Sequence, residues 1–220
     1  PGMYDNDANG IGQAIAAFRV ELANRDIPLA LVGGADVHMV PGLPEAIREG
    51  RVPTIAGSRY LLLEPPHHVA PPRFRESIFD LMVTGCIPVI THPERLTWIE
   101  DHYALFVDVV HAGAWLQLTA GSLTGRFGKR CRYWSERLLD EGLVHVIATD
   151  AHDPRRRPPL LAEGYAAARD RVGVEHATHM VFTRPQGIVD DRNPGELPPL
   201  PAAAVRDAGQ GGLWRWLRRS

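Results

Sequence analysis

The sequence has few cysteines, little net charge and no long apolar run, and each absence excludes a class of protein. Its two cysteines, Cys86 and Cys131, are too few for a disulfide framework and are typical of a reducing compartment. The formal net charge of -2 argues against a nucleic-acid-binding protein or a binder of anionic membranes. We find no signal peptide and no apolar run of about 18 residues. These features predict a cytoplasmic protein without a transmembrane segment.

The composition is that of a globular α/β domain. The chain has 220 residues, of which 45% are hydrophobic and 23% charged, which allows a full hydrophobic core. Apolar segments of strand length alternate with segments of helical periodicity. The expected strands are residues 27–34, 58–64, 87–92, 114–120 and 143–150, and the expected helices are residues 10–26, 71–85, 101–113, 127–142 and about 160–173. This alternation predicts a parallel sheet or barrel.

The two ends of the chain differ in composition from this pattern. The opening PGMYDNDANG has no initiator methionine and no strand before the first helix, so we expect a fragment. After Arg192 the sequence is rich in Pro, Gly and Ala and ends in the basic, aromatic LWRWLRRS. That composition predicts a flexible tail at residues 193–220, which leaves residues 1–192 as the folded domain.

Five side chains able to bind a metal lie at the ends of the predicted strands: Asp36, Glu64, His92, Asp150 and His152. Because reactive side chains gather at the carboxyl ends of parallel strands, we expect these five to lie close together. Carboxylate and imidazole donors without thiolates favour Mn²⁺, Fe²⁺ or Zn²⁺. Each residue alone is more often a cap or a loop side chain, so the whole set carries the metal-site hypothesis.

Arginines beside these residues indicate an anionic substrate. Arg95 follows His92 by three residues, and Arg155, Arg156 and Arg157 follow His152. The guanidinium fork matches phosphate oxygens, so a phosphate is the simplest ligand. A metal would then polarise the phosphoryl group and lower the pKa of a bound water molecule. The alternative for the arginine run is a solvated loop.

Cys131 and Arg137 reproduce the Cys-x₅-Arg spacing of thiol-dependent tyrosine phosphatases. Those enzymes place the motif in a glycine-containing loop between a strand and a helix. Here CRYWSER has no glycine and lies inside the helix predicted at residues 127–142. Since a nucleophilic cysteine needs a helix N-terminus or a focused positive site, we interpret the spacing as a coincidence.

Four segments, GGAD, SRYLLLE, IPVITHPER and LVHVIATDAHDPRRRPP, resemble in their order the PHP (polymerase and histidinol phosphatase) superfamily. The match is closest to the manganese-dependent tyrosine phosphatases of bacterial capsule and exopolysaccharide clusters, over roughly residues 1–192. The resemblance implies a distorted α/β barrel, seven-stranded in the family and incomplete here with about five strands. It also implies up to three metal ions, Mn²⁺ foremost, and a bridging hydroxide that attacks phosphotyrosine. The implied partner is a tyrosine-phosphorylated protein, typically a bacterial tyrosine kinase of polysaccharide synthesis.

The resemblance also implies roles for individual residues. The metal ligands would be Asp36, Glu64, His92, Asp150 and His152. The phosphate would be bound by Arg95 and Arg157. Asp36 stands where the family has the glutamate of a Gly-Ala-Glu motif, so it keeps the charge but shortens the reach. His38, His67 and His68 do not fit the motif order and are not expected to be ligands.

The family's N-terminal His-x-His strand and a further histidine after its second strand have no counterpart in the sequence. The chain therefore resembles a member that lacks two strands and several ligands. Two alternatives stay open beside the phosphotyrosine phosphatase. One is a small-molecule phosphoesterase similar to histidinol phosphatases, which would share the site chemistry. The other is an inactive binding scaffold, because lost strands expose sheet edges and remove metal ligands.

Overall fold

The computed structural model describes residues 7–201, which form one parallel five-stranded sheet with helices around it. The strands, in their spatial order, are β1 (Asp36–His38), β2 (Tyr60–Glu64), β3 (Ile87–Thr91), β4 (Trp115–Thr119) and β5 (Val146–Ala148). Each strand pairs in parallel with the one before it in the chain. This confirms the predicted α/β class, the number of strands and the positions of four of them, β2–β5. Within residues 7–201 the edge strands β1 and β5 do not pair, so the sheet is open and does not close into a barrel.

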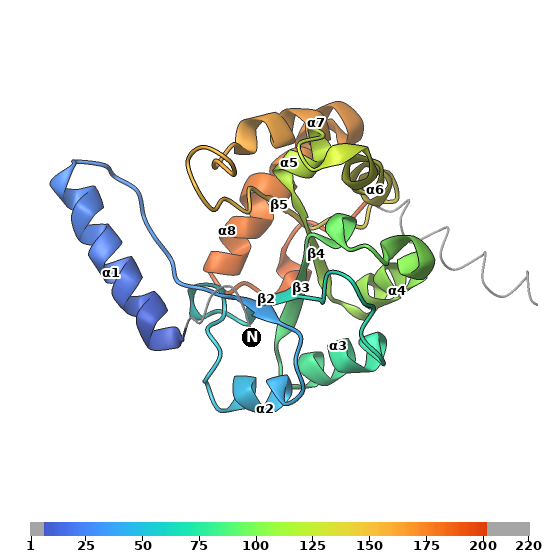
Figure 1. Cartoon of the computed structure of the whole chain (residues 1–220), viewed down its shortest axis with the longest axis horizontal. Coiled ribbons are helices and arrows are strands. Elements are labelled where there is room, and N and C mark those ends of the chain that lie inside the picture. The colour runs from blue at the N-terminus through green and yellow to red at the C-terminus, as the bar shows by residue number, and fades with distance from the viewer. Residues whose placement is uncertain (1–6, 202–220) are drawn as a thin grey trace, which may run out of the picture.

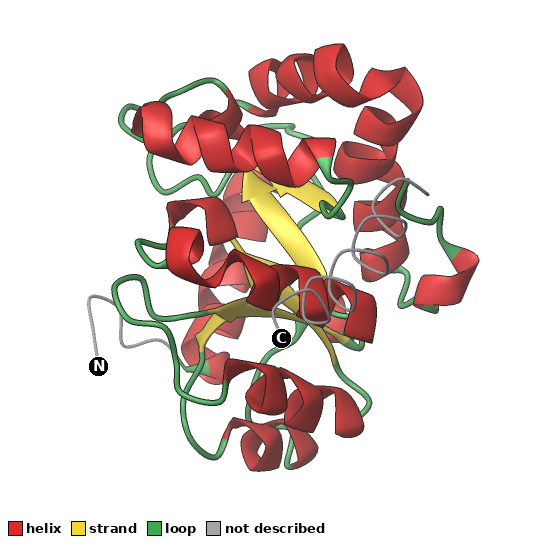
Figure 2. Cartoon of the chain, turned by 90° about the vertical axis from the view of Figure 1, so that its right-hand side faces the viewer, coloured by secondary structure: helices red, strands yellow, loops and turns green. Residues whose placement is uncertain are grey.

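Helices connect the strands and enclose the sheet (Figures 1 and 2). The α-helices are α1 (Ala8–Asn24), α2 (Leu43–Arg48), α3 (Phe74–Val83), α4 (Ile99–Ala112), α5 (Ala120–Leu123), α6 (Gly128–Asp140), α7 (Leu161–Thr178) and α8 (Arg184–Val189). Short 3₁₀ helices span Ile55–Gly57, Pro93–Arg95 and Pro194–Glu196, and a short π-helix spans His179–Thr183. No helix within residues 7–201 is long and apolar enough to cross a membrane.

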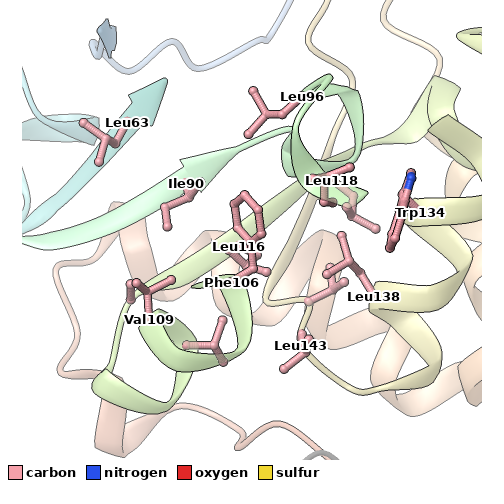
Figure 3. Close-up of a cluster of buried hydrophobic side chains, with 14 of the residues drawn as sticks. Leu63, Ile90, Leu96, Phe106, Val109, Leu116, Leu118, Trp134, Leu138 and Leu143 are labelled. Atoms are coloured by element: carbon pink, nitrogen blue, oxygen red, sulfur yellow. The ribbon is translucent and has the colours of Figure 1, made fainter. Parts of the chain in front are cut away.

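The core has two parts because successive side chains of a strand point to opposite faces of the sheet. The larger part joins β2, β3 and β4 to α3, α4, α6 and α7; Figure 3 shows strand residues such as Ile90 and Leu116 packed against Phe106 of α4 and Leu138 of α6. The smaller part, on the other face, joins the strands to Ile188 of α8. Burial on both faces explains why β2–β5 are almost continuous apolar runs in the sequence.

The strand predicted at residues 27–34 is wrong. The first strand begins only at Asp36, and Ile27, Leu29 and Val32 are largely exposed. The apolar run lies instead beside α1, which stands at the outer edge of the molecule (Figure 1). There Arg19 donates a hydrogen bond of 2.6 Å to the carbonyl of Leu31. Pro28 lacks an N–H group for a strand ladder, and Gly33 and Gly34 disfavour extended pairing, which the apolar pattern alone did not reveal.

Part of the segment after Arg192 packs on the domain. Leu197 is buried and lies against Gly187 of α8, where an added Cβ would meet its side chain at 2.4 Å. Arg184 donates hydrogen bonds to the carbonyls of Pro198 and Pro199. Leu197 therefore belongs to the smaller part of the core and Leu200 packs against the larger part, in contrast to the flexible tail expected from composition. The remainder of that predicted tail, from residue 202, lies outside the described residues.

Candidate metal and phosphate site

Glu64, the last residue of β2, lies among three histidines at the carboxyl edge of the sheet. Its Oε1 is 3.2 Å from Nε2 of His67 and 3.5 Å from Nε2 of His92. Its Oε2 is 2.9 Å from Nδ1 of His38. Potential ligand atoms of Glu64, His67 and His92 all lie within 4.8 Å of one another. A carboxylate beside imidazole nitrogens is a donor set suited to a divalent ion such as Mn²⁺, Fe²⁺ or Zn²⁺.

Asp36, at the start of β1, approaches the same group. Its Oδ2 lies 3.7 Å from Nε2 of His92, and its Oδ1 accepts a hydrogen bond of 3.3 Å from the Thr91 hydroxyl. Burial, followed by the charge of Glu64, raises the pKa of Asp36 to about 7. Two carboxylates in this position disfavour each other's ionised form, and a cation would relieve that cost. Asp36 is therefore near the group, although it does not follow a strand as expected.

The electrostatics of the other two residues also suit a cation. The hydrogen bond from His67 lowers the pKa of Glu64, which keeps this carboxylate ionised at neutral pH. Burial, and then the charge of Arg95, lowers the pKa of His92 to about 4. His92 is thus neutral at pH 7, the state in which an imidazole binds a metal. Its Nδ1 is buried without a hydrogen-bond partner among the described residues.

The turn after β3 fixes His92 and Arg95 through the residue between them. His92 has a left-handed backbone (φ 35°, ψ 52°), uncommon for a residue other than glycine. Glu94 is fully buried, and its Oε1 accepts hydrogen bonds from the Thr119 N–H at 3.0 Å and the Ser122 hydroxyl at 2.8 Å. Burial raises the pKa of Glu94 to about 7. These bonds tie the turn to the start of α5, so that His92 and Arg95 project from a fixed backbone.

Asp150, just after β5, brings the two predicted phosphate-binding arginines together. Its Oδ2 accepts hydrogen bonds from Nη1 of Arg95 and Nη2 of Arg157. The three side chains are 18%, 16% and 27% exposed, respectively, so these ion pairs are largely shielded from water. Asp150 also has a left-handed backbone, with φ 49°. Two guanidinium groups converging on one point form a fork suited to a tetrahedral oxyanion.

The loop from Asp150 to Arg157 folds back on itself. Oδ1 of Asp153 accepts hydrogen bonds from the backbone N–H groups of Arg156 at 2.6 Å and Arg155 at 2.8 Å, which lower the pKa of Asp153. The His152 N–H donates to the carbonyl of Arg157 at 3.0 Å. This geometry returns Arg157 to Asp150 and leaves Arg155 and Arg156 exposed. The solvated-loop alternative therefore fits those two arginines and does not fit Arg157.

His152 lies beside Asp150 and apart from the Glu64 group. Its Nδ1 is 3.0 Å from the carbonyl oxygen of Asp150 and 3.7 Å from Oδ1, and its side chain is 39% exposed. The five predicted ligands therefore form two neighbouring subsets, with Asp36, Glu64 and His92 in one and Asp150 and His152 in the other. The turn after β3 connects the subsets, because Arg95 follows His92 by three residues and donates a hydrogen bond to Asp150.

Cys131 lies within α6, as expected, and not at a phosphate-binding loop. Burial is the main cause that raises the pKa of its thiol. A raised pKa lowers the fraction of thiolate, the reactive form of a cysteine nucleophile. The structure thus agrees with the interpretation of the Cys-x₅-Arg spacing as a coincidence.

Sequence reasoning missed His38, His67 and Glu94. His38 lies two residues after Asp36, hence on the same face of a strand, and its register partner is Glu64. His67 follows Glu64 by three residues, in a loop whose course the sequence does not show. The alternation in β1 was therefore the one available signal, and it pointed to His38.

The sequence matches a known protein family over most of its length. The model of the family described as "Capsular polysaccharide synthesis, CpsB/CapC" matches residues 1–190. This chain belongs to the CpsB/CapC family. The assignment confirms the resemblance found in the four sequence segments.

Curated relatives and a solved structure agree with the CpsB/CapC assignment. The chain is 35% identical over 158 residues to "Tyrosine-protein phosphatase YwqE" of Bacillus subtilis, covering 71% of this chain and 61% of YwqE. It is 32% identical over 160 residues to "Putative tyrosine-protein phosphatase CapC" of Staphylococcus aureus, covering 73% and 63%. The chain thus spans just over three fifths of the length of these two relatives.

A solved structure has a TM-score of 0.83 and 28% identity, covering 87% of this chain and 77% of the other. It comes from crystal structures of YwqE from Bacillus subtilis and CpsB from Streptococcus pneumoniae, described as unique metal-dependent tyrosine phosphatases. The described part of this CpsB/CapC chain therefore has the fold of those proteins.

Proposed function

We propose that this chain carries the catalytic site of a metal-dependent phosphotyrosine protein phosphatase. The observation that carries the proposal is the position of the Glu64 group, suited to a cation, beside the Arg95–Asp150–Arg157 fork, suited to a phosphate. Membership of the CpsB/CapC family and the names of its relatives support phosphotyrosine as the substrate. We further propose a protein substrate in capsular polysaccharide synthesis, with a bacterial tyrosine kinase as the partner.

The proposed metal is Mn²⁺, held by oxygen and nitrogen donors. The ligands we assign are Asp36, Glu64, His67 and His92 in one subset and Asp150 and His152 in the neighbouring one, and the family resemblance allows up to three ions. The fit rests on the raised pKa of Asp36, on the neutral state of His92 and on the absence of thiolates from the donor set. When bound, such an ion supplies Lewis-acid polarisation of the phosphoryl group and a lowered pKa for a water molecule.

The chain's own side chains bind and orient the substrate. Arg95 and Arg157 donate N–H groups to phosphate oxygens and offset the charge that develops during transfer. Asp150 holds both guanidinium groups through Oδ2, so that they are already converged before a phosphate arrives. Because these side chains are largely buried, their electrostatic interactions are stronger than at an exposed position. Glu94, through its hydrogen bonds with Thr119 and Ser122, fixes the turn that carries His92 and Arg95.

The test is hydrolysis of a phosphotyrosyl peptide by this chain with Mn²⁺ and with a chelator. We expect turnover with Mn²⁺ that the chelator abolishes. His92→Asn and Asp150→Asn should abolish it too, and asparagine is chosen because it tolerates a left-handed backbone. Arg157→Ala should lower the transition-state stabilisation, calculated from kcat/KM, by about 2–4 kcal/mol. The matched control is Arg155→Ala, in the same loop but exposed, which should change little.

Other outcomes of this experiment contradict the proposal. Turnover that survives the chelator and is lost in Cys131→Ser would revive the thiol mechanism. A much higher kcat/KM for a small phosphate ester than for the peptide would favour a small-molecule phosphoesterase. A folded chain that binds Mn²⁺ and hydrolyses neither substrate would favour a binding scaffold.

A further inference from the structure

Phe127, the residue before α6, lies against both arginines of the proposed phosphate fork. The Cζ atom of Arg95 is 4.7 Å from the centroid of its ring, and that of Arg157 is 5.7 Å away. A guanidinium group within about 6 Å of a ring centroid is attracted by the negative face of the ring. The same two groups donate hydrogen bonds to Asp150. Each guanidinium is therefore held by a carboxylate and by an aromatic face.

The ring is itself fixed by a close approach to α5. A Cβ atom added to Gly121 would lie 3.0 Å from Cε2 and 3.4 Å from Cδ2 of Phe127. Only glycine at position 121 leaves room for the Phe127 ring in its observed position. Gly121 and Phe127 also line, with Arg157 and other residues, a small cavity of about 80 Å³. The backbone of α5 at Gly121 therefore limits where the Phe127 ring can lie.

The arginines need such support because they come from different parts of the fold and carry like charges. Arg95 belongs to the turn after β3, whereas Arg157 belongs to the loop after β5. One carboxylate, Asp150, serves both, and we have also assigned it to the metal. An aromatic face attracts a guanidinium group and leaves its N–H groups free to bind the phosphate. A second carboxylate would accept hydrogen bonds from those N–H groups and so compete with the phosphate.

We propose that Phe127 is a positioning residue for phosphate binding, which keeps the guanidinium groups of Arg95 and Arg157 converged. This rests on the proposed function, since it concerns the same phosphate site. Phe127 acts through the two arginines. Its loss should therefore weaken the affinity for phosphate as well as for the substrate.

The test measures the affinity of the Mn²⁺-loaded chain for inorganic phosphate by calorimetry, together with KM and kcat for a phosphotyrosyl peptide. Phe127→Leu should raise the phosphate Kd and the KM about 3- to 30-fold, as loss of cation–π contacts predicts. Phe127→Tyr keeps the ring face and should restore both values. The control is Tyr133→Leu, an exposed aromatic residue of α6, which should change neither.

Two further variants separate positioning from general destabilisation. Gly121→Ala keeps Phe127 but displaces its ring, and should raise the phosphate Kd while the thermal midpoint stays close to that of the wild type. In an Arg95→Ala chain, Phe127→Leu should have a smaller effect on the Kd than in the wild type, because its nearer partner is gone.

An unchanged phosphate Kd in Phe127→Leu, or an equal effect with and without Arg95, would overturn this inference and leave the proposed function standing. A wild-type chain that neither binds phosphate nor hydrolyses the peptide would overturn both.

Discussion

Replacing Arg184 by methionine should markedly lower the free energy of unfolding. This first residue of α8 is 1% exposed. Its guanidinium group donates to the carbonyls of His145 at 3.1 Å, Pro198 at 3.1 Å and Pro199 at 2.9 Å. Burial lowers the pKa of Arg184 to about 10, so it stays charged at pH 7. Among residues 7–201 only carbonyl oxygens accept hydrogen bonds from this buried positive charge, which thus joins α8, the residue before β5 and the segment after residue 193.

The expected loss follows from these three bonds. A hydrogen bond from a charged group contributes about 1.5–3 kcal/mol, and the cost of burying the charge offsets part of the sum. Methionine fills most of the volume and removes that charge. The carbonyls of Pro198 and Pro199 lie near the surface and can turn to water, which leaves only the carbonyl of His145 buried and unpaired. We therefore expect Arg184→Met to cost about 2–4 kcal/mol.

Urea unfolding of the complete chain measures this loss. Arg184→Lys, which keeps the charge but not the fork, should fall between the wild type and Arg184→Met. The matched control is Arg192→Met, because Arg192 also donates to a backbone carbonyl but is 47% exposed. The control should change stability by less than about 0.5 kcal/mol. A loss for Arg184→Met no greater than that of the control would refute the reasoning.

Three further predictions concern Cys131, Gly164 and His145. Cys131→Ser should leave phosphatase turnover nearly unchanged, as measured on the phosphotyrosyl peptide. Gly164→Ala should lower the unfolding free energy by about 1–3 kcal/mol in urea, because its Cβ would lie 2.5 Å from that of Ala120. Burial holds the pKa of His145 well below 6.5, so only the unfolded state gains a proton as the pH falls below 6.5. The titration of His145 should then lower the stability by at most about 1.4 kcal/mol per pH unit, and the total slope should be smaller in His145→Gln.

The strands β2–β5 and the helices α1, α3, α4, α6 and α7 were predictable because burial on both faces of the sheet leaves apolar runs, with segments of helical periodicity between them. Residues 27–34 show the limit of that reasoning. An apolar run predicts a strand only where a neighbouring strand pairs with it, and pairing is a property of the tertiary structure. Composition likewise could not show that Leu197 is buried, because its burial depends on its contact with Gly187 of α8, which is a feature of the tertiary structure.

The candidate site divides in a similar way. Residues that follow a strand directly, such as His92 and Asp150, were found because the strand fixes where they lie. The pairing of Arg157 with Asp150 depends on the turn at Asp153, and the sequence did not predict it; the resemblance implied only that Arg157 binds the phosphate. His67 and Phe127 were missed because each reaches the site from a loop. Their positions depend on loop conformation, which leaves no periodic pattern in a sequence.

The order of the strands has a consequence for how the chain folds. Each strand pairs with the one before it, so the sheet can grow from β1 to β5 as the chain leaves the ribosome. Arg95 follows β3 and Asp150 follows β5, with β4 between them. A nascent chain that has completed three strands therefore holds an arginine without its carboxylate. The proposed phosphate fork forms only after β4 has docked and β5 has paired, so binding of a phosphate analogue, if the proposal holds, would report completion of the whole sheet.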